Sequence, residues 1–136
     1  MNATSRVRLV CVISLILGFA GAGAGCQASA GEHNLVVKAS AYNSVPEQTN
    51  SEPTLTAWGD KLEPGMKTIA VSRDLIELGL THGVHVTIEG LPGEYVVLDK
   101  MAARWKRKID IYMGEDVEAA RRWGVRSVAI RWQSKK

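Results

Sequence analysis

Cysteine is almost absent from this sequence of 136 residues, which contains only Cys11 and Cys26. Both lie near the N-terminus, so no disulfide bond can staple the remaining chain, and its fold must be held by packing alone. The apolar run from Leu9 to Ala20 is shorter than the about 20 residues of a membrane helix. Metal-ligand patterns are also scarce, because His82 and His85 are spaced like a ligand pair but lack a matching third ligand. We therefore expect neither a transmembrane helix nor a metal site.

The N-terminus has the order of an export signal. Arg6 and Arg8 precede the apolar run, which is followed by the small-residue stretch "GAGAGCQASA". Cleavage after Ala30 would release a mature domain of residues 31–136. The alternative is lipoprotein processing before Cys26, although the usual Leu three residues earlier is here Gly23. Both routes predict an exported protein of the periplasm or cell envelope, and the second would anchor it through a lipid on Cys26.

The formal net charge of +3 overstates how basic the mature domain is. Residues 31–136 contain all 14 acids and 15 of the 17 bases, so their net charge is +1. Such a balance does not favour nucleic acid as a partner. The length fits one domain with a single core, which we expect to be a monomer.

Alternation of apolar and polar residues predicts a mainly β domain. In "VHVTIEG", Val84, Val86 and Ile88 share one face of a strand, which is the period of a half-buried strand. "GLPGE" then predicts a tight turn, so residues 84–99 should form a hairpin that ends at Asp99. The other expected strands are residues 35–42, a strand ending near Val71, the run "IDIYMG" from Ile109, and residues 126–132.

One helix is expected, over "EDVEAARRWG" at residues 115–124. Acids stand at its start, Arg121 and Arg122 near its end, and Gly124 is a stop signal. Six short strands and one short helix predict a small closed barrel, because closure removes exposed strand edges.

The stretch "DKMAARWKRKID" holds the residues of greatest chemical interest. Asp99 ends one expected strand and Asp110 lies early in the next, so two carboxylates could meet at one cleft. Glycosidic-bond chemistry uses such a pair, in which one acid protonates the leaving oxygen. Ordinary turn chemistry is the alternative for an Asp at a strand end. The five bases between the acids either form a solvated loop or attract an anionic polymer.

Several stretches resemble a known family. They are "ASAYNS", "AWGDKLEPGMKTIAVSRDLIELG", "VHVTIEGLPGEYVVLDK" and "KIDIYMGEDVEAARRWGVRSVAI". Together they are similar to the Asp-Asp-Asp (3D) domain, a six-stranded double-psi β-barrel related to the catalytic domain of membrane-bound lytic transglycosylase A. The resemblance covers roughly residues 37–131. Its most specific parts are the spacing from Asp99 to Asp110 and the pair Trp123 and Gly124.

The resemblance implies a peptidoglycan lytic transglycosylase, which cleaves the MurNAc–GlcNAc bond and closes a 1,6-anhydro ring. Asp110 matches the acid/base and Asp99 its partner acid. No cofactor is implied, and the implied partner is the peptidoglycan glycan strand. The residues assigned to substrate binding in the matched stretches and the basic loop are Tyr42, Trp58, Gly59, Lys100, Trp105 and Tyr112. Packing in the core of the barrel is the alternative for Tyr42 and Trp58.

The sequence departs from the family pattern in two places. Ser72 follows "IAV" where the family has its first aspartate, and Asp74 could replace that aspartate only if the strand continues. The glycine-rich segment of the family is "DKMAARWKR" here. Two rival functions therefore stay open, a non-catalytic peptidoglycan-binding module on the same barrel and a hydrolase that uses both carboxylates with water.

Overall fold

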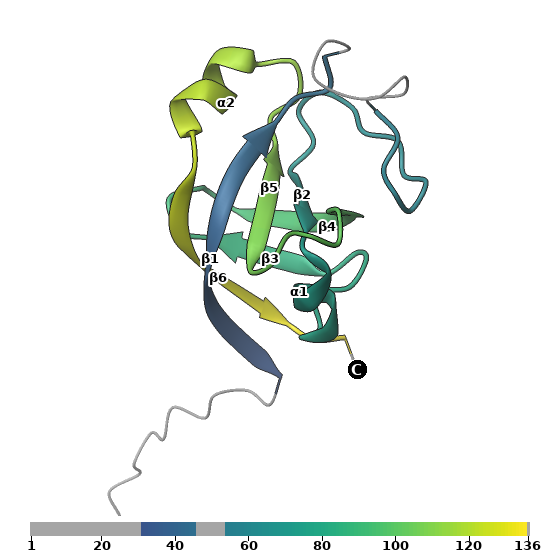
Figure 1. Ribbon diagram of the computed structural model, residues 1–136, viewed down its shortest axis with the longest axis vertical. Helices are drawn as coiled ribbons and strands as arrows, with labels where there is room; N and C mark the ends of the chain where they lie inside the picture. The colour runs from purple at the N-terminus through teal and green to yellow at the C-terminus, as the bar shows by residue number, and fades with distance from the viewer. Residues whose placement is uncertain (1–30, 46–53, 136) are drawn as a thin grey trace, which may run out of the picture.

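The computed structural model describes residues 31–45 and 54–135. They form a closed β-barrel whose strand order is β1-β5-β2-β4-β3-β6 (Figure 1). The predicted signal peptide and its two cleavage routes, including Cys26, lie outside the described residues, as does residue 136. In the described part of the chain, no helix has the length and apolar character needed to cross a membrane.

Six strands and two helices make up the domain. They are β1 (Glu32–Tyr42), β2 (Thr68–Val71), α1 (Arg73–Glu77), β3 (His85–Ile88), β4 (Glu94–Lys100), β5 (Lys108–Tyr112), α2 (Val117–Trp123) and β6 (Arg126–Gln133). Each predicted strand is present, and β1 begins three residues earlier than expected. The predicted hairpin is also confirmed, because β3 and β4 pair antiparallel with Val86 opposite Tyr95.

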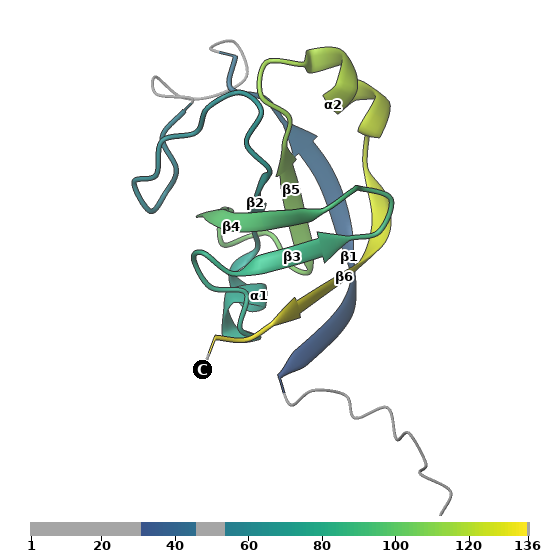
Figure 2. The ribbon, with the colours of Figure 1, turned by 180° about the vertical axis from the view of Figure 1, so that it is seen from behind.

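The barrel mixes parallel and antiparallel pairing. β1 pairs parallel with β5, and β2 pairs parallel with β4. The remaining neighbours are antiparallel, including β2 with β5 and β1 with β6. Figure 1 shows β1, β5 and β2 side by side. Figure 2 is the view from the opposite side, in which β3, β4 and β6 face the viewer. Strands far apart in the sequence are therefore brought together by crossover connections rather than by hairpins.

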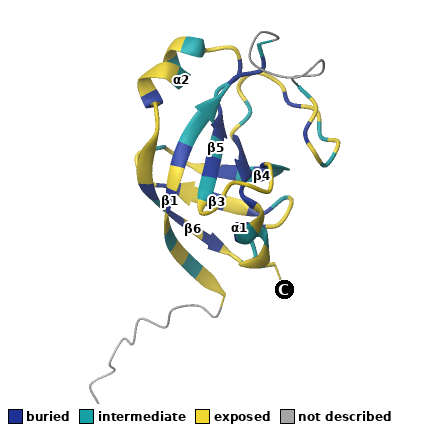
Figure 3. Ribbon diagram, viewed as in Figure 1, coloured by how far each residue is buried: buried dark blue, intermediate teal, exposed yellow. Residues whose placement is uncertain are grey.

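The core fills the inside of this barrel with alternate residues of each strand. Ile109 and Ile111 of β5 and Ile69 and Val71 of β2 are all fully buried in one cluster (Figure 3). Successive side chains of a strand point to opposite faces. The intervening residues of β5 and β2 must therefore lie on the outer face of the barrel.

The described residues form two helices, so the expectation of a single helix was wrong. α1 is one short turn after β2, and a helix of five residues shows no amphipathic period that a sequence could reveal. The predicted helix is confirmed as α2, and the Asp116 carboxylate caps it by accepting the Ala119 backbone N–H at 2.8 Å. Gly124 ends α2 at a φ of 62°. The Trp123 indole N–H donates to the Ala39 carbonyl and ties the helix to β1.

Candidate functional site

Four residues from four strands form a row across the outer face of the barrel. Ser40 of β1 pairs with Asp110 of β5, Asp110 pairs with Ala70 of β2, and Ala70 pairs with Asp99 of β4. We call Ser40, Asp110, Ala70 and Asp99 the acidic row. It brings together the two predicted catalytic acids, which are eleven positions apart in the sequence.

Asp99 reaches this row because of a bulge in β4. Thr68 pairs with Val96 and Ile69 with Val97, but the next pair is Ala70 with Asp99, so Leu98 is an extra residue. In regular alternation Asp99 would share the inner face with Val97. A bulge shifts the register by one residue and re-aims the side chains that follow it. Asp99 thereby comes onto the same face as Asp110.

Asp110 is a partly buried carboxylate with one hydroxyl partner. The Ser40 hydroxyl donates to Asp110 Oδ1 at 3.0 Å. Burial raises the pKa of Asp110 above its ordinary value, since a desolvated carboxylate is less stable when charged. The Ser40 hydrogen bond and the Lys108 charge oppose this effect, and the Asp99 charge adds to it. Burial thus shifts Asp110 toward its protonated form relative to a carboxyl group in water.

Asp99 is instead held by backbone donors. Its Oδ1 accepts the N–H groups of Ala57 and Lys100, each at 2.8 Å. The Ala57 bond joins Asp99 to residues 54–62, which we call the tryptophan loop because it carries Trp58. This loop and β4 thus fix the orientation of the second carboxylate.

Two tyrosines border the acidic row. The rings of Tyr42 and Tyr112 lie 5.4 Å apart at 49°. The Tyr112 hydroxyl donates to Ser44 Oγ at 2.9 Å. Burial raises the pKa of Tyr42, and the charges of Asp99 and Asp110 raise it further. Both acids are therefore close to this tyrosine.

Two hydroxyls near the acids lack hydrogen bonds. Tyr42 Oη and Thr68 Oγ1 are buried atoms without a hydrogen-bond partner in the described part of the chain, and Thr68 is only 2% exposed. Thr68 nevertheless lowers the pKa of Tyr42, so the two groups are neighbours whose contact falls short of a normal hydrogen bond. An unsatisfied buried polar group costs about 1–3 kcal/mol. Because both atoms are buried, they lie out of direct reach of a bound ligand.

The other predicted sugar contacts on this side belong to the tryptophan loop and its surroundings. Trp58 packs against the core cluster and meets the His82 ring edge-on at 5.3 Å. Lys100 Nζ lies 5.7 Å from the Trp58 ring centre. Gly59 turns the loop at a φ of 88° beside open space. His82 pins the loop through Asp60, with 2.7 Å between Nε2 and Oδ2. Trp58, Gly59 and Lys100 thus lie beside Asp99.

Trp105 has a different environment from the one expected of a free sugar platform. It is 37% exposed, but Lys108 Nζ lies 3.7 Å from its ring centre. Arg104 also lies near the ring, at 5.2 Å. Cations on an aromatic face are held by its quadrupole. Trp105 therefore orders the basic loop, residues 100–108, and one of its faces is occupied by Lys108.

Asp74 does not replace the family's first aspartate in the acidic row. β2 ends at Val71, Ser72 precedes α1, and Asp74 lies in the first turn of that helix. Its Oδ2 accepts the Arg107 backbone N–H at 2.9 Å. The condition for this replacement, a continuing strand, is not met.

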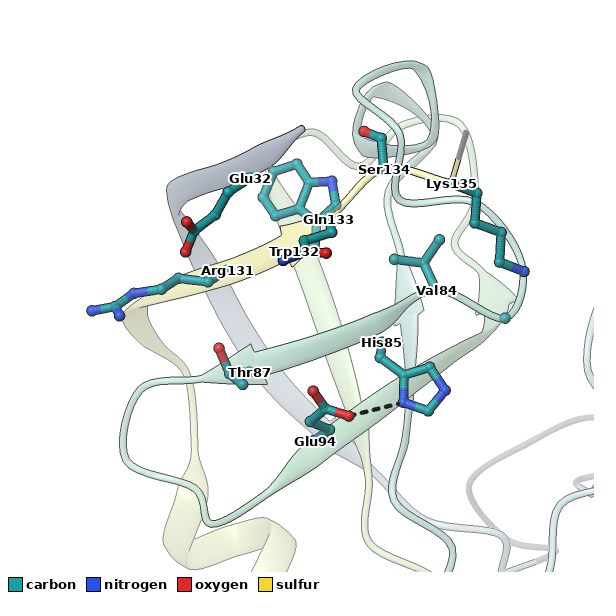
Figure 4. A pocket seen from close by; sticks show the side chains of 11 residues that line it. Glu32, Val84, His85, Thr87, Glu94, Arg131, Trp132, Gln133, Ser134 and Lys135 are labelled. Carbon is teal, nitrogen blue, oxygen red and sulfur yellow. Dashed lines mark hydrogen bonds and ion pairs between the residues drawn. The ribbon is translucent and has the colours of Figure 1, made fainter. Parts of the chain in front are cut away.

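His82 and His85 have separate partners, which are Asp60 in the tryptophan loop and Glu94 of β4. His85 Nδ1 lies 3.2 Å from Glu94 Oε2, and this pair lines a cavity of about 570 Å³ between β3, β4 and β6 (Figure 4). Glu32 and Arg131 extend into the same cavity, which contains no residue of the acidic row. Within the described ranges, no three His, Cys, Asp or Glu side chains come together as metal ligands.

Sequence reasoning missed Ser40, Thr68 and Lys108 as members of this face. Ser40 could have been found from its spacing, because it lies two positions before Tyr42 in a strand and so shares its face. The pairing of Ser40 with Asp110 could not have been found from the sequence, since this contact between parallel strands joins positions 70 residues apart. Lys108 likewise lies two positions before Asp110 in β5 and influences its pKa.

Replacing Asp110 by Asn is expected to stabilise the barrel at neutral pH and to have no effect well below pH 3.8, the ordinary pKa of aspartate. Asn keeps an acceptor for Ser40 but carries no charge. The pKa of Asp110 is higher in the folded protein than in the unfolded chain, so ionisation of this carboxylate lowers the free energy of unfolding. This destabilisation develops as the pH rises from 3.8 through the pKa of the folded protein, and it is complete above that pKa. Urea unfolding of both proteins across this range measures the difference.

Glu115→Gln, at an exposed position, is the matched control for this pH series. A stability gain of Asp110→Asn that is equally large at both ends of the pH range would contradict the explanation.

Comparisons with known proteins support the fold. No family model matches the sequence, and no curated protein matches it. The apo structure of an expansin from Clavibacter michiganensis is similar with a TM-score of 0.51 and 15% identity, over 76% of this chain and 52% of that chain. A mutant of the same expansin in complex with cellohexaose is similar with a TM-score of 0.46 and 16% identity, over 76% and 51% of the two chains.

The chain therefore spans about half the length of these expansin chains. Membership of the Asp-Asp-Asp family stays a prediction, since no family model supports it. The expected fold is confirmed: this chain is a six-stranded double-psi β-barrel of the kind found in a bacterial expansin.

Proposed function

We propose that this protein is a binding module for cell-wall polysaccharide, which holds a glycan chain on the outer face of β1, β5, β2 and β4. The observation that carries the proposal is the acidic row, where Asp99 and Asp110 converge beside Tyr42. The shared fold with an expansin barrel supports it. We further propose that the polymer is the peptidoglycan glycan strand and that the protein is exported to the cell envelope.

The chemistry of this face suits sugars. Carboxylates accept charge-assisted hydrogen bonds from sugar hydroxyls, and these are stronger than neutral ones. The ring of Tyr42, which is only partly buried, can cover the face of a sugar ring.

A second candidate function is lytic cleavage of the glycan, and the raised pKa of Asp110 favours it. A general acid must hold its proton near the working pH, and burial acts on Asp110 in that direction. Asp99 could then orient the substrate or stabilise developing positive charge. We place binding ahead of cleavage because Ser72 stands where the family has its first aspartate and Asp74 does not reach the acidic row.

Incubating the protein with purified peptidoglycan tests both candidates. We expect the protein to sediment with the sacculi and to release no soluble fragments, as measured by mass spectrometry of the supernatant. Anhydro-muropeptides in the supernatant would establish the lytic function instead, and new reducing ends would indicate a hydrolase. Failure to sediment with any wall polysaccharide, cellulose included, would refute the proposed binding function.

A further inference from the structure

A small cavity lies on the outer face of the barrel, two residues along β1 from the acidic row. Its volume is about 310 Å³, and its lining residues are Val36, Val37, Lys38, Arg107 and Ser127. We call it the cationic hollow, because two of these residues carry a positive charge and none carries a negative charge.

The strand register connects the cationic hollow to the acidic row. Ser127 of β6 pairs with Lys38 of β1, and Lys38 pairs with Lys108 of β5. Lys38 stands two positions before Ser40 on the same face of β1, and two residues of a strand span about 7 Å. A polymer that crosses the acidic row can therefore reach the hollow within about one sugar unit.

The two cations of the hollow are available to a ligand. The ion pairs within residues 31–45 and 54–135 involve His82, His85 and Arg121, and neither Lys38 nor Arg107 takes part in one. The Asp74 carboxylate is bound to the Arg107 backbone N–H rather than to its guanidinium group. Both cationic side chains are exposed.

The backbone at Arg107 is held in place against its own preference. Arg107 has a φ of 46°, the one positive φ among the described non-glycine residues. Its N–H donates to Asp74, and its carbonyl accepts the Lys38 N–H at 2.9 Å. A left-handed conformation costs on the order of 1 kcal/mol for a residue with a side chain. These two bonds fix the backbone of Arg107 beside that of Lys38, so the backbone of the hollow is preformed.

We propose that the cationic hollow binds an anionic substituent of the wall glycan, a carboxylate or phosphate group, while the neighbouring sugar lies over the acidic row. This inference rests on the proposed glycan-binding function and specifies its substrate class. Lys38 and Arg107 supply charge-assisted donors, and the Ser127 hydroxyl supplies a third donor. Asp99 and Asp110 would repel an anion placed over them. The cationic hollow and the acidic row together therefore select both the charge of the polymer and its position.

The test compares the full mature protein with the double variant Lys38→Gln/Arg107→Asn. Asn is chosen because it tolerates a left-handed φ and keeps the backbone N–H. Affinity electrophoresis measures binding to three soluble polymers: a neutral cellulose ether, a polyuronate that carries carboxylates, and a polyol phosphate. We expect the variant to bind one or both anionic polymers about ten-fold more weakly, with a smaller salt dependence, and the neutral polymer unchanged.

Arg122→Gln/Arg131→Gln is the control, since it removes two exposed charges outside the hollow. The polyuronate and the polyol phosphate distinguish carboxylate from phosphate recognition. If the wild type prefers neither anionic polymer over the neutral one, or if the control loses as much affinity as the variant, the inference is refuted while glycan binding stands. If the wild type binds no polymer at all, the proposed function fails and the inference fails with it.

Discussion

Binding to the wall glycan should fall about 100-fold or more when Asp99 and Asp110 are both replaced by Asn. Hydrogen bonds to charged groups contribute about 1.5–3 kcal/mol each, and each 1.4 kcal/mol is about a factor of ten in affinity. Asn retains an acceptor oxygen for the Ser40 hydroxyl and for the N–H groups of Ala57 and Lys100. The loss should therefore come from the missing charges and not from a distorted face.

The dissociation constant for soluble glycan fragments, measured by calorimetry, gives this effect directly. Glu77→Gln/Glu115→Gln is the matched control, because it removes two exposed acids outside the row. The double Asn variant should also be at least as stable as the wild type at neutral pH, since position 110 then carries no partly buried charge. Unchanged glycan affinity in the double Asn variant would show that the ligand does not lie on the acidic row.

Replacing Ile111 by Ala is expected to destabilise the barrel by about 2–5 kcal/mol. Ile111 is 0% exposed in β5 and pairs with Ala41 of β1 and Ile69 of β2, so it lies at the centre of the core. Its truncation leaves a cavity between strands that cannot all move inward, because the barrel is closed. Total stabilities of domains are about 5–15 kcal/mol, so the loss is a large share.

Urea unfolding followed by tryptophan fluorescence measures this loss. Val125→Ala is the control, because Val125 is 67% exposed and its truncation should change stability by no more than about 0.5 kcal/mol. Glycan binding by Ile111→Ala should persist wherever the variant is still folded, since the side chain points away from the acidic row. A loss below about 1 kcal/mol would contradict the central position of Ile111.

The barrel could be predicted from sequence because its strands carry a local signal. Alternation of apolar and polar residues, as in Val84 to Ile88, is the direct result of one face meeting the core. The hairpin of β3 and β4 was predictable as well, because a tight turn joins its strands. α1 was missed because its single turn has no period, and its position depends on where β2 ends.

The candidate site was predictable in its residue types but not in its arrangement. Asp99 is recognisable at the end of one expected strand and Asp110 early in the next, and Tyr42 and Tyr112 lie near them in the matched stretches. Trp105 was expected to offer its ring to sugar, but Lys108 lies on that ring. Such a contact depends on the path of the basic loop, which its sequence does not reveal.

By itself, the sequence determined which segments become strands, which residues enter the core and which acids are present. Only the tertiary structure decided that the two acids share a face. The reason is physical: alternation would direct Asp99 inward with Val97, and the one-residue register shift at Leu98 brings it outward, opposite Ala70 and beside Asp110. That shift arises from pairing between distant strands, so no local pattern encodes it.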